Sequence, residues 1–564
     1  MSLQSKKQTS IVYFFVMIFL IAASDFLYYI LDSQYRIAWL KTISCFCIFL
    51  LPLFLFRNHL KIYALLLSPV FLLVPISICE TLFLHYGINV TLAESIINTT
   101  QNEAVELLHQ FALKVIVAFI LSLIIYFLLA NRIPSKISFK QSFVLSTASL
   151  MVFLALPSFH NDDVMVGSGY INKLKGNLES TFPISIGYYV KSGYQDFKLI
   201  RVTRPLRSTF RFGAKQTPLY TGKEVCVLII GEACRADHWH INGYNRNTSP
   251  LADRRENLIS FSNVASAATY TELAVPQILT LAAPEKFGDH YSQKSIISAF
   301  KEAGFTTYWI DDQFDGAQIN MHKEEADNIY HFRVYREENV HLENTDMQLI
   351  SALRKVLEQP VEKKFIIIHT MGSHWDYRQR YPNTYDQFKP SEKSFPVEPT
   401  DVSNRNILIN TYDNCILFTD AMLDSVYQIM NTQHARSMAF FIADHGEDLM
   451  DDDNHYYLHG NFPTLFNTHV PFFIWYNDSI KNSCSEKICE LIRHRDNKIG
   501  AENIFPTITN LCDIYFSGED STKCIDRSSF IDSKQKIIYL HNDTLNKTIT
   551  FDSLKILASR TVKF

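Results

Sequence analysis

Residues 225–235 read VCVLIIGEACR, an apolar run that stops at Glu232. A run that is apolar throughout, rather than at alternate positions, is typical of a strand covered on both faces. Helical segments such as SIISAFKEAGF and NILINTYDNCILFTDAMLDSVYQIM separate this run from others like it. This alternation predicts an α/β domain with a mainly parallel central sheet. The other apolar runs lie at 306–310, 365–370, 439–444, 471–475 and 537–540.

Polar side chains follow three of these runs. Glu232 follows the first, Asp444 and His445 stand at the end of another, and His374 follows a third. His459 lies just beyond, in YYLHGN. Because the carboxyl ends of parallel strands meet at one edge of a sheet, we expect these side chains to converge. Carboxylate oxygens and imidazole nitrogens suit Zn²⁺ or Mn²⁺, so the sequence predicts a divalent metal site there.

A metal site of this type needs a nucleophile, and SNVASAATYTELAVPQIL offers several hydroxyl groups. Thr269 and Glu272 have the Thr-x-x-Glu spacing of a capping box, which predicts a helix that begins at Thr269. A helix N-terminus binds phosphate, and a hydroxyl that contacts a divalent metal loses its proton near neutral pH. From the residues alone the candidates for the nucleophile are Thr269, Thr271, Ser262 and Ser266.

The first 157 residues contain apolar stretches that each approach the ~20 residues a membrane-crossing helix needs. Lys and Arg cluster before the first stretch, between the second and third, and between the fourth and fifth. Positive charge favours the cytoplasmic side, so an odd number of spans places everything after Pro157 outside the cytoplasm. The expected spans lie at 11–31, 39–56, 62–84, 113–130 and 141–157.

The expected organisation is therefore a five-span transmembrane domain over 1–157, an interfacial linker over 158–220 and an extracytoplasmic catalytic domain over 221–564. The polar segment 85–111 carries no Lys or Arg and falls on the outer side. It is either a simple connecting loop or a surface helix that faces the catalytic domain near its active site.

The composition excludes two classes of protein. Lys and Arg number 53 against 57 Asp and Glu, a net charge of −4, which argues against nucleic acid as a partner. Charged residues form 20% and aromatic residues 13% of the chain, which excludes a mainly disordered protein. In an oxidising compartment, short spacings favour the disulfides Cys484–Cys489 and Cys512–Cys524, although spacing alone does not fix the connectivity.

The segment GEACRADHWHINGYNRNTSP, residues 231–250, resembles the GE-(S/T)-x-R…GYxRxTxP signature of bacterial phosphoethanolamine transferases. These enzymes belong to the alkaline phosphatase/sulfatase-like superfamily. Further segments resemble the family's motifs in type and order, and the resemblance covers nearly the whole chain, including the five-span half. These segments are HYGI (85–88), FSNVASAAT (261–269), GSHWDYRQRYP (372–382), YDNCILFTD (412–420), ADHGE (443–447) and LHG (458–460).

The resemblance implies one zinc ion or two, and it implies that Thr269 is the nucleophile. His374 and His459 would bind the phosphoryl group or a second metal. Thr99 and Glu103 would hold the ethanolamine end of the donor. The zinc ligands that the resemblance implies are Glu232, Thr269, Asp444 and His445.

By the same resemblance, phosphoethanolamine moves from phosphatidylethanolamine through a covalent threonine intermediate to lipopolysaccharide, at lipid A or a core sugar, or to another surface glycan. The protein would be a monomer that contacts membrane lipids in the bacterial inner membrane, with its catalytic domain in the periplasm. The chain departs from lipid A-modifying members at Ala267-Ala268 and in DDQFDGAQIN, which leaves the acceptor open. Alternatives are a lipoteichoic-acid-type phosphoglycerol transferase, a phosphatase- or sulfatase-like hydrolase and a non-enzymatic membrane sensor.

Overall fold

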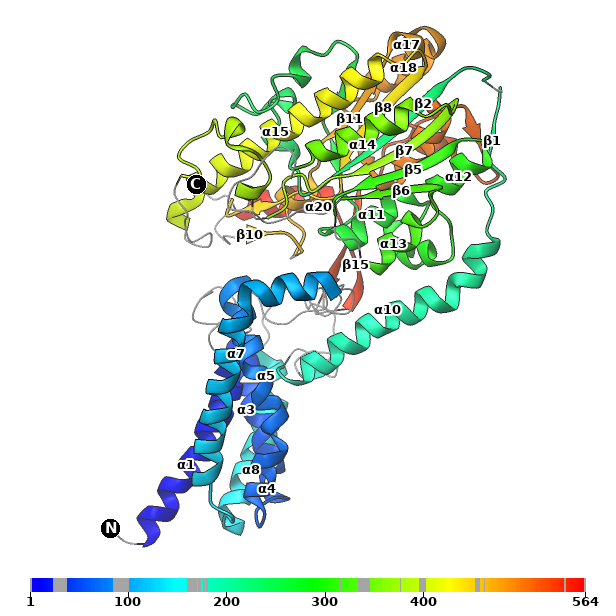
Figure 1. Cartoon of the computed structure of the whole chain (residues 1–564). Helices are drawn as coiled ribbons and strands as arrows, with labels where there is room; N and C mark the ends of the chain where they lie inside the picture. Colours follow the sequence, from blue (N-terminus) through cyan, green and yellow to red (C-terminus); the bar gives the residue numbers. More distant parts are fainter. Residues whose placement is uncertain are drawn as a thin grey trace. The chain divides into compact units, whose positions relative to one another are not determined.

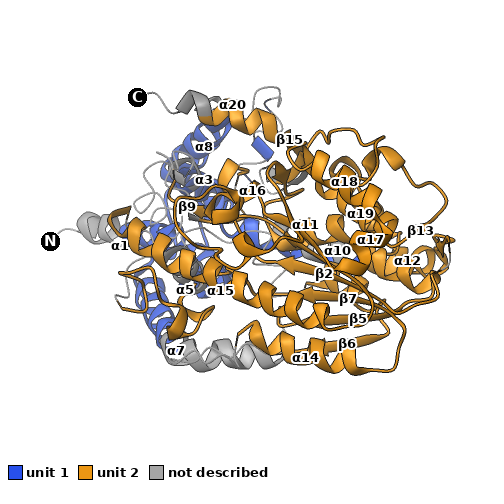
Figure 2. Cartoon of the chain, turned by 90° about the horizontal axis from the view of Figure 1, so that it is seen from above, with its two compact units in different colours: residues 1–198 blue, residues 199–564 orange. Residues whose placement is uncertain are grey.

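The protein divides into two compact units, residues 1–198 and 199–564, and the division falls within helix α10, Ile184–Thr209 (Figure 2). Each unit is described by itself. The computed structural model describes residues 3–23, 38–84, 101–159, 170, 174–175, 178, 181–218, 220–313, 316–332, 345–375, 377–394, 402–451, 457–460, 462–541 and 544–561.

The first unit is helical, and its helices pack around a core that includes Phe14, Tyr63, Phe71 and Tyr126. Many other apolar side chains remain exposed, above all on the helices over residues 101–132 and 139–155. Within the described part of the chain, no helix combines the length and the apolar character that crossing a membrane requires. The helices are α1 (Leu3–Ile21), α3 (Ala38–Leu50), α4 (Leu60–Leu66), α5 (Ser68–Leu84), α7 (Gln101–Arg132) and α8 (Phe139–Ala155).

The second unit is built on a seven-stranded sheet with the order β3-β11-β8-β2-β7-β5-β6. Only β11 among these strands runs against its neighbours, so the sheet is mixed, with six strands in one direction. The α/β architecture is confirmed. The strands are β2 (Glu224–Gly231), β3 (Leu258–Phe261), β5 (Thr306–Asp311), β6 (Asn328–His331), β7 (Lys363–His369), β8 (Arg436–Ala443) and β11 (Phe472–Tyr476).

Helices cover both faces of this sheet, with α14 (Met347–Glu358) and α15 (Arg405–Asn431) on one and α11 (Thr271–Leu279) and α12 (Ile296–Glu302) towards the other (Figure 1). Every residue of β2 and β8 is buried. The double cover explains why these strands are apolar throughout instead of at alternate positions.

One predicted strand lies elsewhere. The run 537–540 belongs to β14 (Lys536–His541), which pairs with β15 (Thr544–Thr550) as a separate antiparallel hairpin. Ile537 and Ile538 are buried against small clusters that are distinct from the main core. An apolar run therefore indicated a buried strand correctly, but it did not indicate the sheet to which that strand belongs.

The two disulfides that spacing favours are not formed, because all the described cysteines are free thiols. Cys484 is buried at the N-cap of α18 (Ser485–Arg493), whereas Cys489 lies on that helix and is exposed. An offset of five residues turns the two side chains about 140° apart around a helix. The thiol of Cys512 lies beside Cys226.

Candidate active site at the carboxyl ends of the strands

Two adjacent parallel strands deliver the acidic residues of the site. Gly231 at the end of β2 is in register with Ala443 at the end of β8, so Glu232 and Asp444 leave the sheet side by side. The Asp444 amide donates to the Gly231 carbonyl at 2.9 Å. The Ala233 amide donates to Asp444 Oδ1 at 3.2 Å. The convergence that the sequence predicted at this edge is thus present for this pair.

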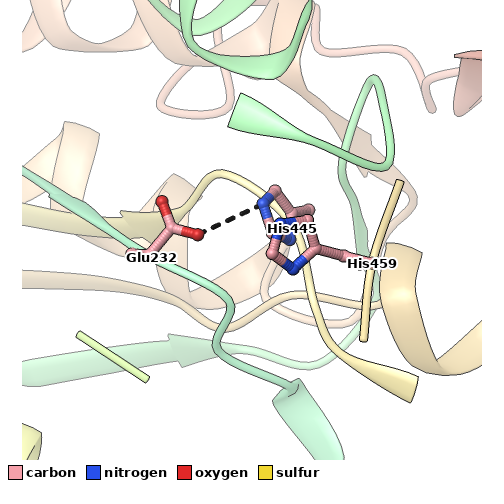
Figure 3. Close-up of side chains that lie close together, drawn as sticks. All are labelled: Glu232, His445 and His459. Atoms are coloured by element: carbon pink, nitrogen blue, oxygen red, sulfur yellow. Dashed lines mark ion pairs between the residues drawn. The ribbon is translucent and has the colours of Figure 1, made fainter. Parts of the chain in front are cut away.

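His445 completes the centre of the site (Figure 3). Its Nε2 lies 3.3 Å from Glu232 Oε1 and 3.3 Å from Asp444 Oδ2. Its Nδ1 donates to the Gly446 carbonyl at 2.8 Å, which leaves Nε2 directed at the two carboxylates. The ligand atoms of Glu232, His445 and His459 all lie within 4.8 Å of one another.

The donor set fits a divalent cation. Within the described residues, Glu232 Oε1 and Asp444 Oδ2 are buried and have no hydrogen-bond partner. Two buried carboxylate oxygens without a partner are costly unless positive charge compensates them. Burial opposes protonation of His445, but Asp444 and Glu232 outweigh it and raise the pKa of His445 to about 10. Two oxygens and an imidazole nitrogen are ligands that zinc accepts.

A hydroxyl in contact with this centre is that of Thr271, the first residue of α11. Its Oγ1 donates to Glu232 Oε2 at 3.1 Å and lies 3.3 Å from His445 Nε2. The predicted capping box, with a helix start at Thr269, is wrong, because Tyr270 occupies the N-cap in an extended conformation. Thr269 is also buried, and its carbonyl accepts a hydrogen bond from the Gly460 amide at 2.9 Å.

The structure adds two supporting residues that the sequence analysis missed. Gln313 Nε2 donates to Glu232 Oε2 at 2.9 Å and to the Thr370 carbonyl at 2.7 Å. Gly372 has a φ of +43°, and a Cβ there would lie 2.7 Å from the Glu232 carbonyl oxygen. Gln313 follows β5, so the rule that located Glu232, applied to one more strand, would have found it.

The two remaining histidines lie beside the centre. The ring centroid of His459 lies 4.2 Å from that of His445 and 5.7 Å from that of His374. His459 Nδ1 lies 3.0 Å from Glu447 Oε2. Burial lowers the pKa of His374 to about 4, so this imidazole is neutral at physiological pH.

The two residues expected to hold the ethanolamine group remain predictions. Thr99 lies outside the residues that the structure describes. Glu103 lies on α7, but its side chain is outside the described part.

The sequence matches the family model described as Sulfatase over residues 224–514. Phosphoethanolamine transferase EptC of Escherichia coli K12 is 25% identical over 529 residues, which cover 90% of this chain and 89% of the relative. Kdo(2)-lipid A phosphoethanolamine 7''-transferase of Salmonella typhimurium is 31% identical over 261 residues, or 45% of this chain and 44% of the relative.

Two solved structures are similar to this fold. The C-terminal periplasmic domain of E. coli EptC in complex with Zn superposes with a TM-score of 0.54 at 25% identity, over 60% of this chain and 96% of that one. The integral membrane lipooligosaccharide phosphoethanolamine transferase A of Neisseria meningitidis gives a TM-score of 0.69 at 20% identity, over 90% of this chain and 98% of that one, and shows a shared fold. The chain belongs to the sulfatase family, in the branch whose named relatives are bacterial phosphoethanolamine transferases.

Proposed function

We propose that the protein is a phosphoethanolamine transferase that modifies lipopolysaccharide, with phosphatidylethanolamine as the donor. One observation carries this proposal: the Thr271 hydroxyl contacts Glu232 and His445, beside two buried carboxylate oxygens that have no hydrogen-bond partner among the described residues. The named relatives transfer phosphoethanolamine, which supports the choice of transferred group.

We propose Thr271, rather than the Thr269 that the resemblance implies, as the nucleophile. Thr271 Oγ1 already donates to Glu232 Oε2, so its proton can leave towards that carboxylate as the oxygen attacks phosphorus. The bond from phosphorus to the diacylglycerol oxygen breaks, that oxygen takes up a proton, and phosphoethanolamine remains on Thr271. An acceptor oxygen then displaces the group from Thr271 and gives up its own proton.

Zinc would be held by Glu232, Asp444 and His445, and when bound it lowers the pKa of a neighbouring hydroxyl and offsets charge on phosphoryl oxygens. Neutral His374 and the adjacent His459 can hydrogen-bond phosphoryl oxygens. Thr271 is the first residue of α11, so the positive end of the helix dipole lies where negative charge develops. Thr99 and Glu103 are proposed to hold the ethanolamine ammonium group.

We further propose that unit 1 lies in the bacterial inner membrane, with the five spans inferred from the sequence, and that the catalytic domain lies in the periplasm. Exposed apolar side chains on α7 and α8 support this, because a monomeric soluble protein seldom exposes so many together. They include Ile120, Leu121, Phe127, Leu128, Phe143 and Met151.

The test compares Thr271→Ala with Thr269→Ala, and uses Thr271→Ser as the conservative control. Without its attacking oxygen, Thr271→Ala should lose transfer by a factor on the order of 10³ or more. Thr271→Ser and Thr269→Ala should both retain the covalent adduct. Intact-mass analysis after incubation with phosphatidylethanolamine, followed by peptide mapping, measures the adduct and its position. An adduct that persists in Thr271→Ala and maps to Thr269 would restore the earlier prediction.

A further inference from the structure

A basic groove in the catalytic unit is lined by residues of the C-terminal part of α10, of α12 and the segment before it, and of α13 (Ala317–Lys323) and the residues after it. Figure 1 shows where these helices lie. Its volume is about 520 Å³, within the range of small-ligand sites. The charged residues that line it are Arg204, Arg207, Arg211, Lys294, Lys301, Glu302, Glu324 and Glu325.

Two of the three carboxylates in the groove already accept hydrogen bonds from the protein. Glu302 accepts from the Phe212 amide at 3.2 Å and the Ala214 amide at 3.0 Å. Glu325 accepts from the Ser298 hydroxyl at 2.7 Å and pairs with His322. Five cations and three carboxylates line the groove, so positive charge is in excess.

The cations of the groove face one another as well as the open volume. Lys301 is paired with Asp327 at 2.8 Å, whereas no ion pair among the described residues involves Arg204 or Lys294. Burial lowers the pKa of the Lys294 ammonium, and the neighbouring Arg211 lowers it further. A phosphate group would relieve this repulsion and accept charge-assisted hydrogen bonds from the guanidinium groups.

The helix that carries the arginines also presents apolar side chains to the outside. Val202 and Leu206 are 63% and 62% exposed, one turn apart on α10. Exposed apolar side chains beside arginines can contact the acyl chains of a molecule whose phosphate the arginines bind. A ligand that combines phosphate with a lipid anchor would use both features.

Helix α13 connects the groove to the active site. Its N-cap Gly316 lies so close to Glu272 that a Cβ at this glycine would come within 2.5 Å of Glu272 Oε1, and Glu272 directly follows Thr271. Its other end carries Met321, which lines the groove. Seven helical residues span about 10 Å, which is the scale of the separation that α13 sets between the groove and Glu272.

We infer that the groove binds a phosphate group of the acceptor, a multiply phosphorylated glycolipid, while another part of the same molecule reaches Thr271. The inference rests on the proposed function and assigns the part of the acceptor that the protein recognises. Arg204 and Lys294 serve as binding residues for this phosphate and take no part in the chemistry.

The test uses the full chain in detergent, with Arg204→Gln and Lys294→Gln singly and together. Arg201→Gln is the matched control, because Arg201 is an exposed cation on α10 that does not line the groove. Equilibrium binding is measured in a Thr271→Ala background, with bis-phosphorylated lipid A and with its monophosphorylated form. The double variant should weaken binding of the bis-phosphorylated form by roughly tenfold or more, and the control should not.

Three outcomes would overturn the inference. The variants could bind the bis-phosphorylated form as the wild type does, or lose affinity equally for both forms. They could also lose only sedimentation with vesicles of phosphatidylglycerol and phosphatidylethanolamine, which would assign the groove to bilayer phosphates. A separate measurement distinguishes failure of this inference from failure of the proposed function: formation of the Thr271 adduct by the wild type with phosphatidylethanolamine alone. Absence of that adduct would contradict the proposed function, whereas the binding measurements test the groove.

Discussion

At the residue scale, the buried carboxylate oxygens of Glu232 and Asp444 determine how strongly a bound metal ion should stabilise the protein. Each carboxylate keeps one buried oxygen without a hydrogen-bond partner in the described structure. A cation bound there should stabilise the fold by about 2.7 kcal/mol when free zinc exceeds its dissociation constant a hundredfold. We expect the catalytic unit to melt at a lower temperature after chelation and to recover with zinc.

Asp444→Asn provides the control for this prediction, because the amide keeps the shape of the side chain and removes its charge. The variant should bind less zinc and lose most of the chelator-dependent shift in melting temperature. Thermal unfolding followed by circular dichroism, together with metal analysis, measures both quantities. An equal shift in Asp444→Asn would place the stabilising ion elsewhere.

Gly372 supports the same centre through the backbone. A methyl group at this position would lie 2.7 Å from the oxygen and 2.9 Å from the nitrogen of Glu232. Gly372→Ala should therefore displace Glu232 and weaken zinc binding by about 10- to 100-fold, as changes around metal ligands commonly do. Competition with a chromophoric chelator measures this affinity.

The control for Gly372→Ala is Gly518→Ala. Gly518 also has a positive φ, +84°, but nothing lies within 4 Å of its virtual Cβ. Gly518→Ala therefore introduces the same kind of backbone strain as Gly372→Ala, but its new methyl group collides with no other atom. Equal losses of zinc affinity in the two variants would show that strain alone, rather than contact with Glu232, is responsible.

At the element scale, the strands were predictable and the start of the catalytic helix was not. Apolar runs identified β2, β5, β7, β8 and β11 because a strand covered on both faces has no polar alternation. The polar residues after β2 and β8 then followed from the geometry of a parallel sheet. The start of α11 depends instead on the extended conformation of Tyr270, which the capping-box pattern does not encode. The helix therefore begins at Thr271, two residues after the Thr269 start that the capping-box pattern predicted.

The hairpin β14–β15 supports the base of α11. The Ile538 amide donates to the Ala267 carbonyl at 2.7 Å, and the Ile538 side chain is buried with Tyr270 and Leu273. Ile538→Ala should cost about 2–5 kcal/mol in the free energy of unfolding, the usual range for such a cavity. Because the cavity opens beneath Thr271, transfer should fall as well.

Ile525→Ala serves as the comparison, since Ile525 is equally buried but belongs to the main core. It should lower the unfolding free energy by a similar amount and leave the turnover number of the folded fraction unchanged. Urea titration and transfer kinetics separate the two effects. A turnover number that falls equally in both variants would assign the loss to general instability rather than to the position of α11.

At the scale of the whole molecule, the sequence predicted a division into an apolar first part and an α/β second part. The observed division at residues 198 and 199 falls within α10, inside the segment 158–220 that the sequence analysis expected to be an interfacial linker. Composition could not locate it, because α10 carries both exposed apolar side chains and many cations. The core of the sheet lies entirely within the second unit, from Phe212 to Phe530.

This division predicts that residues 199–564 fold without the first unit. Their main core has no member before residue 199, so removal of unit 1 exposes none of the sheet. The fragment should remain in solution without detergent, bind zinc with the affinity of the full chain and form the adduct on Thr271 with a donor dispersed in detergent. Transfer to a lipid-anchored acceptor should fall sharply, because the apolar surface proposed to hold the enzyme at the bilayer is gone. Size-exclusion chromatography, zinc titration and product analysis test these statements. A fragment that aggregates would contradict independent folding of residues 199–564, and a fragment that transfers at the full rate would contradict the proposed role of unit 1.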